Sequence, residues 1–180
     1  SEHGNIPVSG IGHSSCRTLS NFSIEQIGED AKIMCIESIN PQKVDSSKYS
    51  IIFEPYSVGE ILAFVIAPNF NFKIFSEKKS CFSNNLEKQI ATKELTLIDD
   101  PHIPEGIGTK SFDDEGVETQ KNILTDEGVF KNTFSNLYDS YKEEKHTTGN
   151  AVRIGSPMGR SAEPIPLSSP HNLKINSGDI

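Results

Sequence analysis

Cysteine is scarce in this sequence, and the cysteines that occur do not form pairs. Only Cys16, Cys35 and Cys81 are present among the 180 residues, and no two of them form a C-x-x-C motif. An odd and widely spaced set argues against a disulfide framework and against a zinc knuckle. We therefore expect reduced thiols with a structural role.

Long apolar runs are also missing. No stretch approaches the roughly 20 apolar residues that a membrane-spanning helix requires. Residues 1–5 contain neither the basic nor the apolar region of a signal peptide. These absences favour a cytoplasmic protein that does not act at a membrane.

Positive charge is in short supply. The chain has 17 Lys and Arg against 25 Asp and Glu, and its formal net charge is −8. Most of the excess lies in residues 99–127, where nine acidic residues face only Lys110 and Lys121. Binding to nucleic acid requires a basic surface that neutralises phosphates, so we expect no nucleic-acid partner.

The common catalytic motifs are absent as well. The five histidines are scattered, and no H-E-x-x-H helix or G-x-S-x-G elbow is present. Residues 106–111 only hint at a phosphate-binding loop, because no glycine precedes Lys110 directly. The sequence therefore predicts neither a catalytic residue nor a metal ligand.

Two capping boxes predict helices. Ser23–Gln26 precedes apolar residues at helical spacing, which predicts a helix over 24–38 with Cys35 on its core face. Ser57–Glu60 precedes an almost wholly apolar run that Pro68 ends, which predicts a buried helix over 58–67.

The remaining pattern is typical of short strands and turns in one α+β domain over residues 1–180. We expect a mixed, mostly antiparallel sheet with two or three helices. Residues 155–170 read as an exposed loop, because they hold many prolines and serines. The other predicted elements are a strand at 49–53, weak strand character at 70–75, a strand at 94–98, a hairpin at 121–135, a helix at 137–145 and a strand at 172–175.

Four polar segments that contain Gly or Asp-Pro turns lie between Leu95 and Arg153, each beside a β-prone run. Strand ends and turns that converge in this way usually present binding sites. If these segments served only local turns, Asp114→Ala or Asn150→Ala would each cost about 1 kcal/mol of stability. The candidate residues for a substrate or partner surface are Asp113, Asp114, Glu115, Gly116, Thr148, Gly149, Asn150 and Arg153.

Two alternatives apply to these residues. The carboxylates of Asp113, Asp114 and Glu115 are hard oxygen donors for Ca²⁺ or Mg²⁺, but the spacing of an EF-hand is absent, so capping of backbone N–H groups is favoured. Arg153 either holds one of the carboxylates in a charge-assisted bond or is a solvated surface residue.

The same four segments, in this order, resemble the C-terminal domain of the TldD/PmbA family, also called the modulator-of-DNA-gyrase or TldD/TldE peptidase family. The resemblance extends more loosely over nearly the whole chain, which implies the central and C-terminal part of such a protein. In TldD-type members the segment equivalent to 58–68 carries a zinc motif H-E-x-x-x-H, completed by a cysteine nearer the C-terminus. Here the matching positions are Ala63, Phe64 and Pro68, which cannot bind zinc or accept a proton.

The resemblance therefore implies a PmbA/TldE-type chain without a cofactor of its own. Such a chain would be the non-catalytic subunit of a TldD/TldE-type metallopeptidase that acts on peptides or unfolded proteins in proteolysis and peptide maturation. Zinc would belong to a TldD-like partner, and the assembly would be a heteromer or a homodimer. The alternatives are an autonomous metallopeptidase whose ligands lie outside this sequence and a protein-binding module without enzymatic activity.

Overall fold

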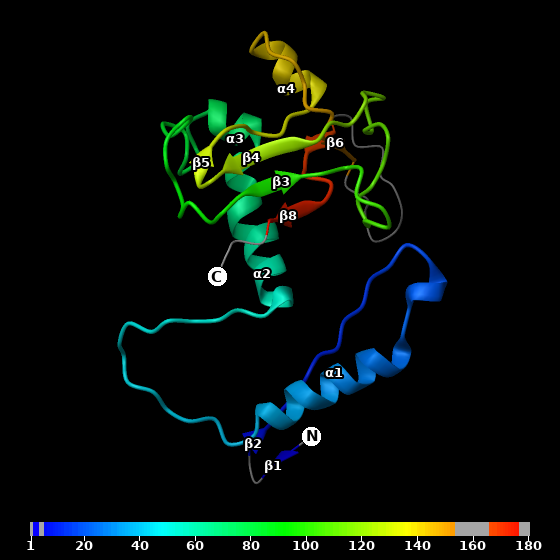
Figure 1. Ribbon diagram of the computed structural model, residues 1–180, viewed down its shortest axis with the longest axis vertical. Coiled ribbons are helices and arrows are strands. Elements are labelled where there is room, and N and C mark those ends of the chain that lie inside the picture. The colour runs from blue at the N-terminus through cyan, green and yellow to red at the C-terminus, as the bar shows by residue number, and fades with distance from the viewer. Residues whose placement is uncertain (1, 4–5, 154–165, 177–180) are drawn as a thin grey trace. The chain divides into compact units, whose positions relative to one another are not determined.

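The computed structural model describes residues 2–3, 6–153 and 166–176, and its contacts divide the chain into two compact units, residues 1–52 and 53–180. Figure 1 shows the elements of both units. The expectation of a single domain over residues 1–180 stays a prediction. The loop predicted at 155–170 lies largely outside the described residues.

The first unit contains the predicted capped helix. Two short strands, β1 (Glu2–His3) and β2 (Ile6–Pro7), pair antiparallel, and a 3-10 turn at Leu19–Asn21 leads to α1 (Ile24–Glu37). The Ser23 hydroxyl accepts the backbone N–H of Gln26 at 3.2 Å, which confirms the start of the helix. The Gln26 amide donates to Asp30 instead of returning to Ser23, so only half of the capping box forms.

No residue of α1 is buried, and the prediction that Cys35 belongs to the core is wrong. Cys35 is half-buried, and its thiol lies 3.9 Å from the Val8 carbonyl oxygen. Backbone of residues 8–12 covers this face of the helix, with Gly10 close to Ala31. One extended segment is too narrow a cover to exclude water from a helix face.

The strand predicted at 49–53 is also wrong. Residues 49–53 form exposed coil, and the side chain of Ile52 is 98% exposed. A β-prone run becomes a strand only when a neighbouring strand supplies partners for its backbone groups. Among the described residues, no strand pairs with this segment.

The second unit is built on an antiparallel sheet of four strands in the order β5-β4-β3-β8. The predicted hairpin is confirmed: its turn has positive φ at both Glu127 (45°) and Gly128 (74°), the backbone geometry that a tight hairpin requires. A bulge near Leu97 shifts the register between β3 and β4, so Leu124 is skipped in the pairing and points into the core. The strands are β3 (Leu97–Asp99), β4 (Asn122–Asp126), β5 (Val129–Phe130) and β8 (Leu173–Ile175).

A smaller pair, β6 (Ala151–Val152) with β7 (Leu167–Ser168), and a capped helix, α4 (Leu137–Lys142), complete this unit. The side chain of Asn136 accepts the N–H of Asp139 at 2.7 Å, as expected for the helix start. The α+β class with an antiparallel sheet is confirmed. The described residues hold four α-helices, because the region around residue 65 breaks into short pieces.

That region is a helical run of changing pitch, which the extended backbone of Asn71 interrupts before its last segment. It starts with α2 (Pro55–Ile61), continues as a π-helical turn η2 (Leu62–Ile66) and a 3-10 turn η3 (Ala67–Phe70), and ends with α3 (Phe72–Ser76). The second capping box is not used, because the helix begins at Pro55 after Glu54, whose side chain makes no cap. Pro68 does not stop the run, because its missing N–H falls in the first turn of η3.

The prediction that 58–67 is a buried helix is wrong. Ala67 is buried, and Leu62 and Ile66 are partly buried against the core, whereas Phe64 is 79% exposed and Val65 is 58% exposed. The stretch is apolar on most sides, but among the described residues only one side of it packs against the core.

The weak strand predicted at 70–75 is a helix instead. The side chain of Asn71 accepts the N–H groups of Lys73 and Ile74, and this cap starts α3. Only a single bridge between Asn71 and Phe134 retains strand character.

The core of the second unit lies between the helical run and the four-stranded sheet (Figure 1). Phe70 and Phe130 meet edge to face with ring centroids 5.3 Å apart, and Phe75 meets Phe130 at 5.5 Å. Leu97, Leu124 and Phe134 fill the space between them and the sheet. This core fixes the far end of β3, where the polar turns gather.

Candidate functional site

The polar turns meet at Asp99, the last residue of β3. Its side chain is fully buried. One carboxylate oxygen accepts the backbone N–H groups of His171 (2.8 Å) and Asn172 (2.9 Å), and the other accepts the side-chain amide of Asn150 (2.6 Å). Asp99 thereby joins three segments that lie far apart in the sequence.

Asn150 is the second centre of this network and is also fully buried. Its amide nitrogen donates to the Ser169 carbonyl oxygen at 3.1 Å, and its amide oxygen accepts the Thr148 hydroxyl at 2.7 Å. Thr148 in turn accepts the backbone N–H of Ser135 at 2.7 Å. Both amide protons and the amide oxygen of the Asn150 side chain therefore have protein partners.

Asp113 ties its own turn to β6. One of its carboxylate oxygens accepts the N–H groups of Glu115 and Val117, each at 2.9 Å, and the other accepts the N–H of Ala151 at 2.9 Å. This carboxylate is 3% exposed. The arrangement is that of an Asp that caps backbone donors.

The next two acids reach neighbouring segments. Asp114 accepts the backbone N–H of Arg153 at 2.7 Å and lies 3.5 Å from the Lys110 ammonium. Glu115 accepts the N–H of Leu137 at 2.6 Å, at the start of α4. Arg153 thus contacts the acidic turn through its backbone N–H group. This contact forms whether its guanidinium binds a carboxylate or faces solvent.

The two glycines of the candidate set take the left-handed conformation, with φ of 80° at Gly116 and 68° at Gly149. Gly149 is buried beside the carbonyl of Glu118, so a side chain there would meet backbone as well as an unfavourable φ. Its own carbonyl oxygen lies 2.8 Å from the imidazole Nε2 of His171.

The structure therefore brings all eight predicted residues into one neighbourhood, in two layers. Asp113, Gly149 and Asn150 are buried, whereas Gly116 and Arg153 are exposed. Asp114, Glu115 and Thr148 are half-buried and lie between the two layers. The outer layer is the part that is open to solvent.

Several residues of the network were not among the predicted site residues, and they include Asp99, Ser135, His171 and Asn172. Asp99 comes directly after a stretch in which polar and apolar residues alternate. This pattern could have identified it as a polar side chain at the end of a strand. His171 and Asn172 lie more than 70 positions beyond Asp99, and no local pattern indicates that pairing.

Within the residues that the structure describes, no group of three His, Cys, Asp or Glu side chains is placed to hold a metal ion. The carboxylates of the acidic turn are already engaged by backbone N–H groups. The described residues of the site therefore offer hydrogen-bonding groups and charges, which are carried by turns at the end of the sheet.

Comparison with known proteins gives the family. Residues 46–180 match the model of the PmbA/TldA metallopeptidase C-terminal domain. The chain belongs to this family. The resemblance to TldD/PmbA proteins in their C-terminal domain is thereby confirmed.

Individual relatives agree with the family model. A metalloprotease PmbA homolog of Buchnera aphidicola subsp. Baizongia pistaciae is 29% identical over 131 residues, which are 72% of this chain and 29% of that protein. A solved structure described as a modulator of a DNA gyrase, from Thermotoga maritima, superposes with a TM-score of 0.75 at 26% identity and covers 98% of this chain and 38% of its own. TldE from Thermococcus kodakarensis superposes with a TM-score of 0.60 at 25% identity, over 68% of this chain and 26% of its own.

The chain spans about a third of the length of the proteins it matches. In its described part, no helix is both long and apolar enough to cross a membrane.

Proposed function

We propose that this chain belongs to the non-catalytic, PmbA/TldE-like subunit of a heteromeric TldD/TldE-type metallopeptidase. In this assembly a TldD-like partner holds the zinc ion and cleaves peptides or unfolded proteins. This chain completes the assembly and contributes to its substrate or partner surface.

The observation that carries the proposal is the chemistry of the helical run at the motif positions. Ala63 and Phe64 lie in η2, and Pro68 lies in η3. An alkyl group, a phenyl ring and a pyrrolidine ring have no lone pair for zinc, and none can take a proton from water. Family membership alone does not distinguish the two kinds of subunit, so the argument depends on these residues.

The exposed side of the same run supports a partner. Tyr56, Ile61, Phe64 and Val65 are between 36% and 79% exposed and lie within ten positions of one another. Grouped exposed apolar side chains are typical of protein–protein contacts. Leu62 and Ile66 pack against the core from this run, so the exposed side chains stand on a fixed support.

The exposed layer of the polar turns, together with the half-buried Asp114 and Glu115, is the second supporting feature. Asp114, Glu115, Gly116 and Arg153 are held by backbone bonds and are partly or fully open to solvent. Polar groups that are fixed before binding lose little freedom when a partner arrives. We include them in the substrate or partner surface.

Assembly with a TldD-type protein tests this proposal. We expect the chain to form a complex with that protein, measured by gel filtration, and the complex to hydrolyse a peptide that the chain alone leaves intact. Replacing the exposed ring in Phe64→Gln should weaken assembly about tenfold or more, because burying a phenylalanine contributes about 1.5–3 kcal/mol.

The matched control is Tyr141→Ala. Tyr141 is an equally prominent aromatic residue, 84% exposed, on α4. Its loss should leave assembly unchanged. Absence of any complex would support a binding module of another kind, and peptide hydrolysis by the isolated chain would contradict the non-catalytic role.

A further inference from the structure

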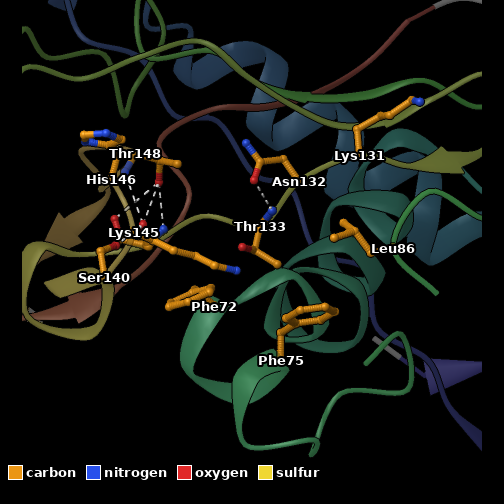
Figure 2. Close-up of a pocket in the computed structure, with 11 residues that line it drawn as sticks. Phe72, Phe75, Leu86, Lys131, Asn132, Thr133, Ser140, Lys145, His146 and Thr148 are labelled. Carbon is orange, nitrogen blue, oxygen red and sulfur yellow. Dashed lines mark hydrogen bonds between the residues drawn. The ribbon is translucent and has the colours of Figure 1, made fainter. Parts of the chain in front are cut away.

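A cavity of about 110 Å³ lies in the second unit between α3, the segment after β5 and residues 145–148. Figure 2 shows Phe72 and Phe75 on one side, with the Lys145 side chain extending across Phe72. None of the eleven lining residues is Asp or Glu, in a chain that has 25 such residues. The lining is therefore apolar on one wall and rich in cations and hydrogen-bond donors on the other.

Lys145 is the available cation of this cavity. Its ammonium lies 5.1 Å from the centre of the Phe72 ring. Among the described residues, no carboxylate lies within ion-pair distance of it. Lys131, also in the lining, is already paired with Glu87 at 2.7 Å. An ammonium held over a ring and without a carboxylate partner is suited to an anionic ligand.

Ser135 supplies a buried donor. It is 3% exposed, and its hydroxyl oxygen accepts the Ser140 hydroxyl (2.7 Å) and the Thr148 N–H (3.1 Å). Its own proton has only a contact of 3.5 Å with the Thr148 hydroxyl, which is long for this type of hydrogen bond. This long contact is weak, so a carboxylate in the cavity that Ser135 lines would compete for the proton.

His146 also lines the cavity. Opposite the polar groups, Phe72, Phe75 and Leu86 form an apolar wall. A ligand that satisfies both sides is an anion with a compact apolar group attached.

We propose that this cavity binds a small carboxylate that carries an apolar side chain, the chemistry of the C-terminal residue of a peptide. The carboxylate would bind the Lys145 ammonium and the Ser135 hydroxyl, and the apolar group would pack on the phenylalanine wall. Charge-assisted bonds of this kind are about twice as strong as neutral ones. That the carboxylate comes from a peptide rests on the proposed function. That the ligand is a carboxylate with an apolar group rests on the residues that line the cavity.

Titration of the chain with N-acetyl-leucine, followed by NMR, tests the proposal. We expect saturable shifts of the backbone signals of Ser135, His146 and Thr148. N-acetyl-leucinamide, which lacks the charge, should bind about tenfold more weakly, and inorganic phosphate, which lacks the apolar group, should also bind more weakly. Lys145→Gln should lower the affinity for N-acetyl-leucine about tenfold.

The matched control is Lys142→Gln. Lys142 is an exposed lysine on α4 that is not part of this lining, and its loss should leave the affinity unchanged. Equal binding of the acid and its amide, equal binding of phosphate, or no shift at these residues would each overturn the proposal. The titration needs neither a partner nor peptidase activity, so its failure is distinguishable from failure of the proposed subunit role.

Discussion

The two halves of the second unit are held together in different ways. Between the helical run and the sheet, Phe70, Phe130 and Leu124 pack with almost no exposed surface. At the end of β3, the buried side chains are polar, and Asp99 and Asn150 are their centres. The first half depends on shape and apolar area, and the second depends on matched donors and acceptors.

This difference determines how each half responds to change. An apolar core loses stability in proportion to the volume removed, because neighbours relax only partly. A polar cluster loses stability when one partner is removed and the other stays buried and unpaired. In the described residues, every fully buried side-chain nitrogen or oxygen has a partner, so each deletion in the cluster would create such an orphan.

The largest effect is expected in the apolar half. Phe130→Ala should cost about 3–5 kcal/mol of unfolding free energy, because the ring is fully buried against Phe70 and Phe75. Chemical denaturation measures this loss. Phe64→Ala is the control: its ring is 79% exposed, and we expect a change of about 0.5 kcal/mol or less in the isolated chain. Similar losses for the two variants would mean that the helical run packs differently from this description.

A smaller effect is expected in the polar half, and it should differ between the layers. Asn150→Ala should cost about 2–3 kcal/mol, because it leaves the buried Asp99 carboxylate and Thr148 hydroxyl short of a partner. Asp114→Ala should cost about 1 kcal/mol, because its carboxylate is half-buried and water can replace it. From the sequence alone, about 1 kcal/mol is expected for each variant if the two residues serve only local turns, because the sequence does not show which of them is buried.

The same pair of variants tests the candidate surface. In a reconstituted complex, Asp114→Ala should reduce peptidase activity by more than its loss of stability explains, and Asn150→Ala should reduce both together. Activity that follows stability in both variants would assign the whole cluster to folding.

Local signals predicted much of this fold correctly. Three of these signals are the helix caps at Ser23 and Asn136 and the turn at Glu127–Gly128. Each depends only on residues a few positions away, so a short stretch of sequence is enough to predict it. The strand over 97–99 and the final strand at 173–175 were also predicted, with boundaries that differ by a few residues.

The errors have a common cause. Residues 49–53 and 58–67 are apolar enough to be buried, but burial requires a neighbouring surface. In the described chain, the core of the second unit packs against Leu62, Ile66 and Ala67 of these two stretches. Cys35 on α1 is likewise only half-buried, because a single extended segment covers its face of the helix.

The grouping of the polar turns could be predicted only in part, and their role as a substrate or partner surface stays a prediction. Glycine and acidic turns beside β-prone runs identified eight residues that lie together in the structure. Asp99, His171 and Asn172 were missed as site residues, because their hydrogen bonds close a loop of more than 70 residues. The cavity beside Lys145 was not predicted at all, because its lining comes from five separate stretches of sequence.

The zinc content of the reconstituted complex tests the central claim most directly. We predict that the chain alone binds no stoichiometric zinc, because Ala63, Phe64 and Pro68 provide no ligand, and that a complex with a TldD-type protein contains one zinc ion per pair, held by the partner. Elemental analysis of the separated and combined proteins measures both values. One tightly bound zinc ion in the chain alone would contradict the account.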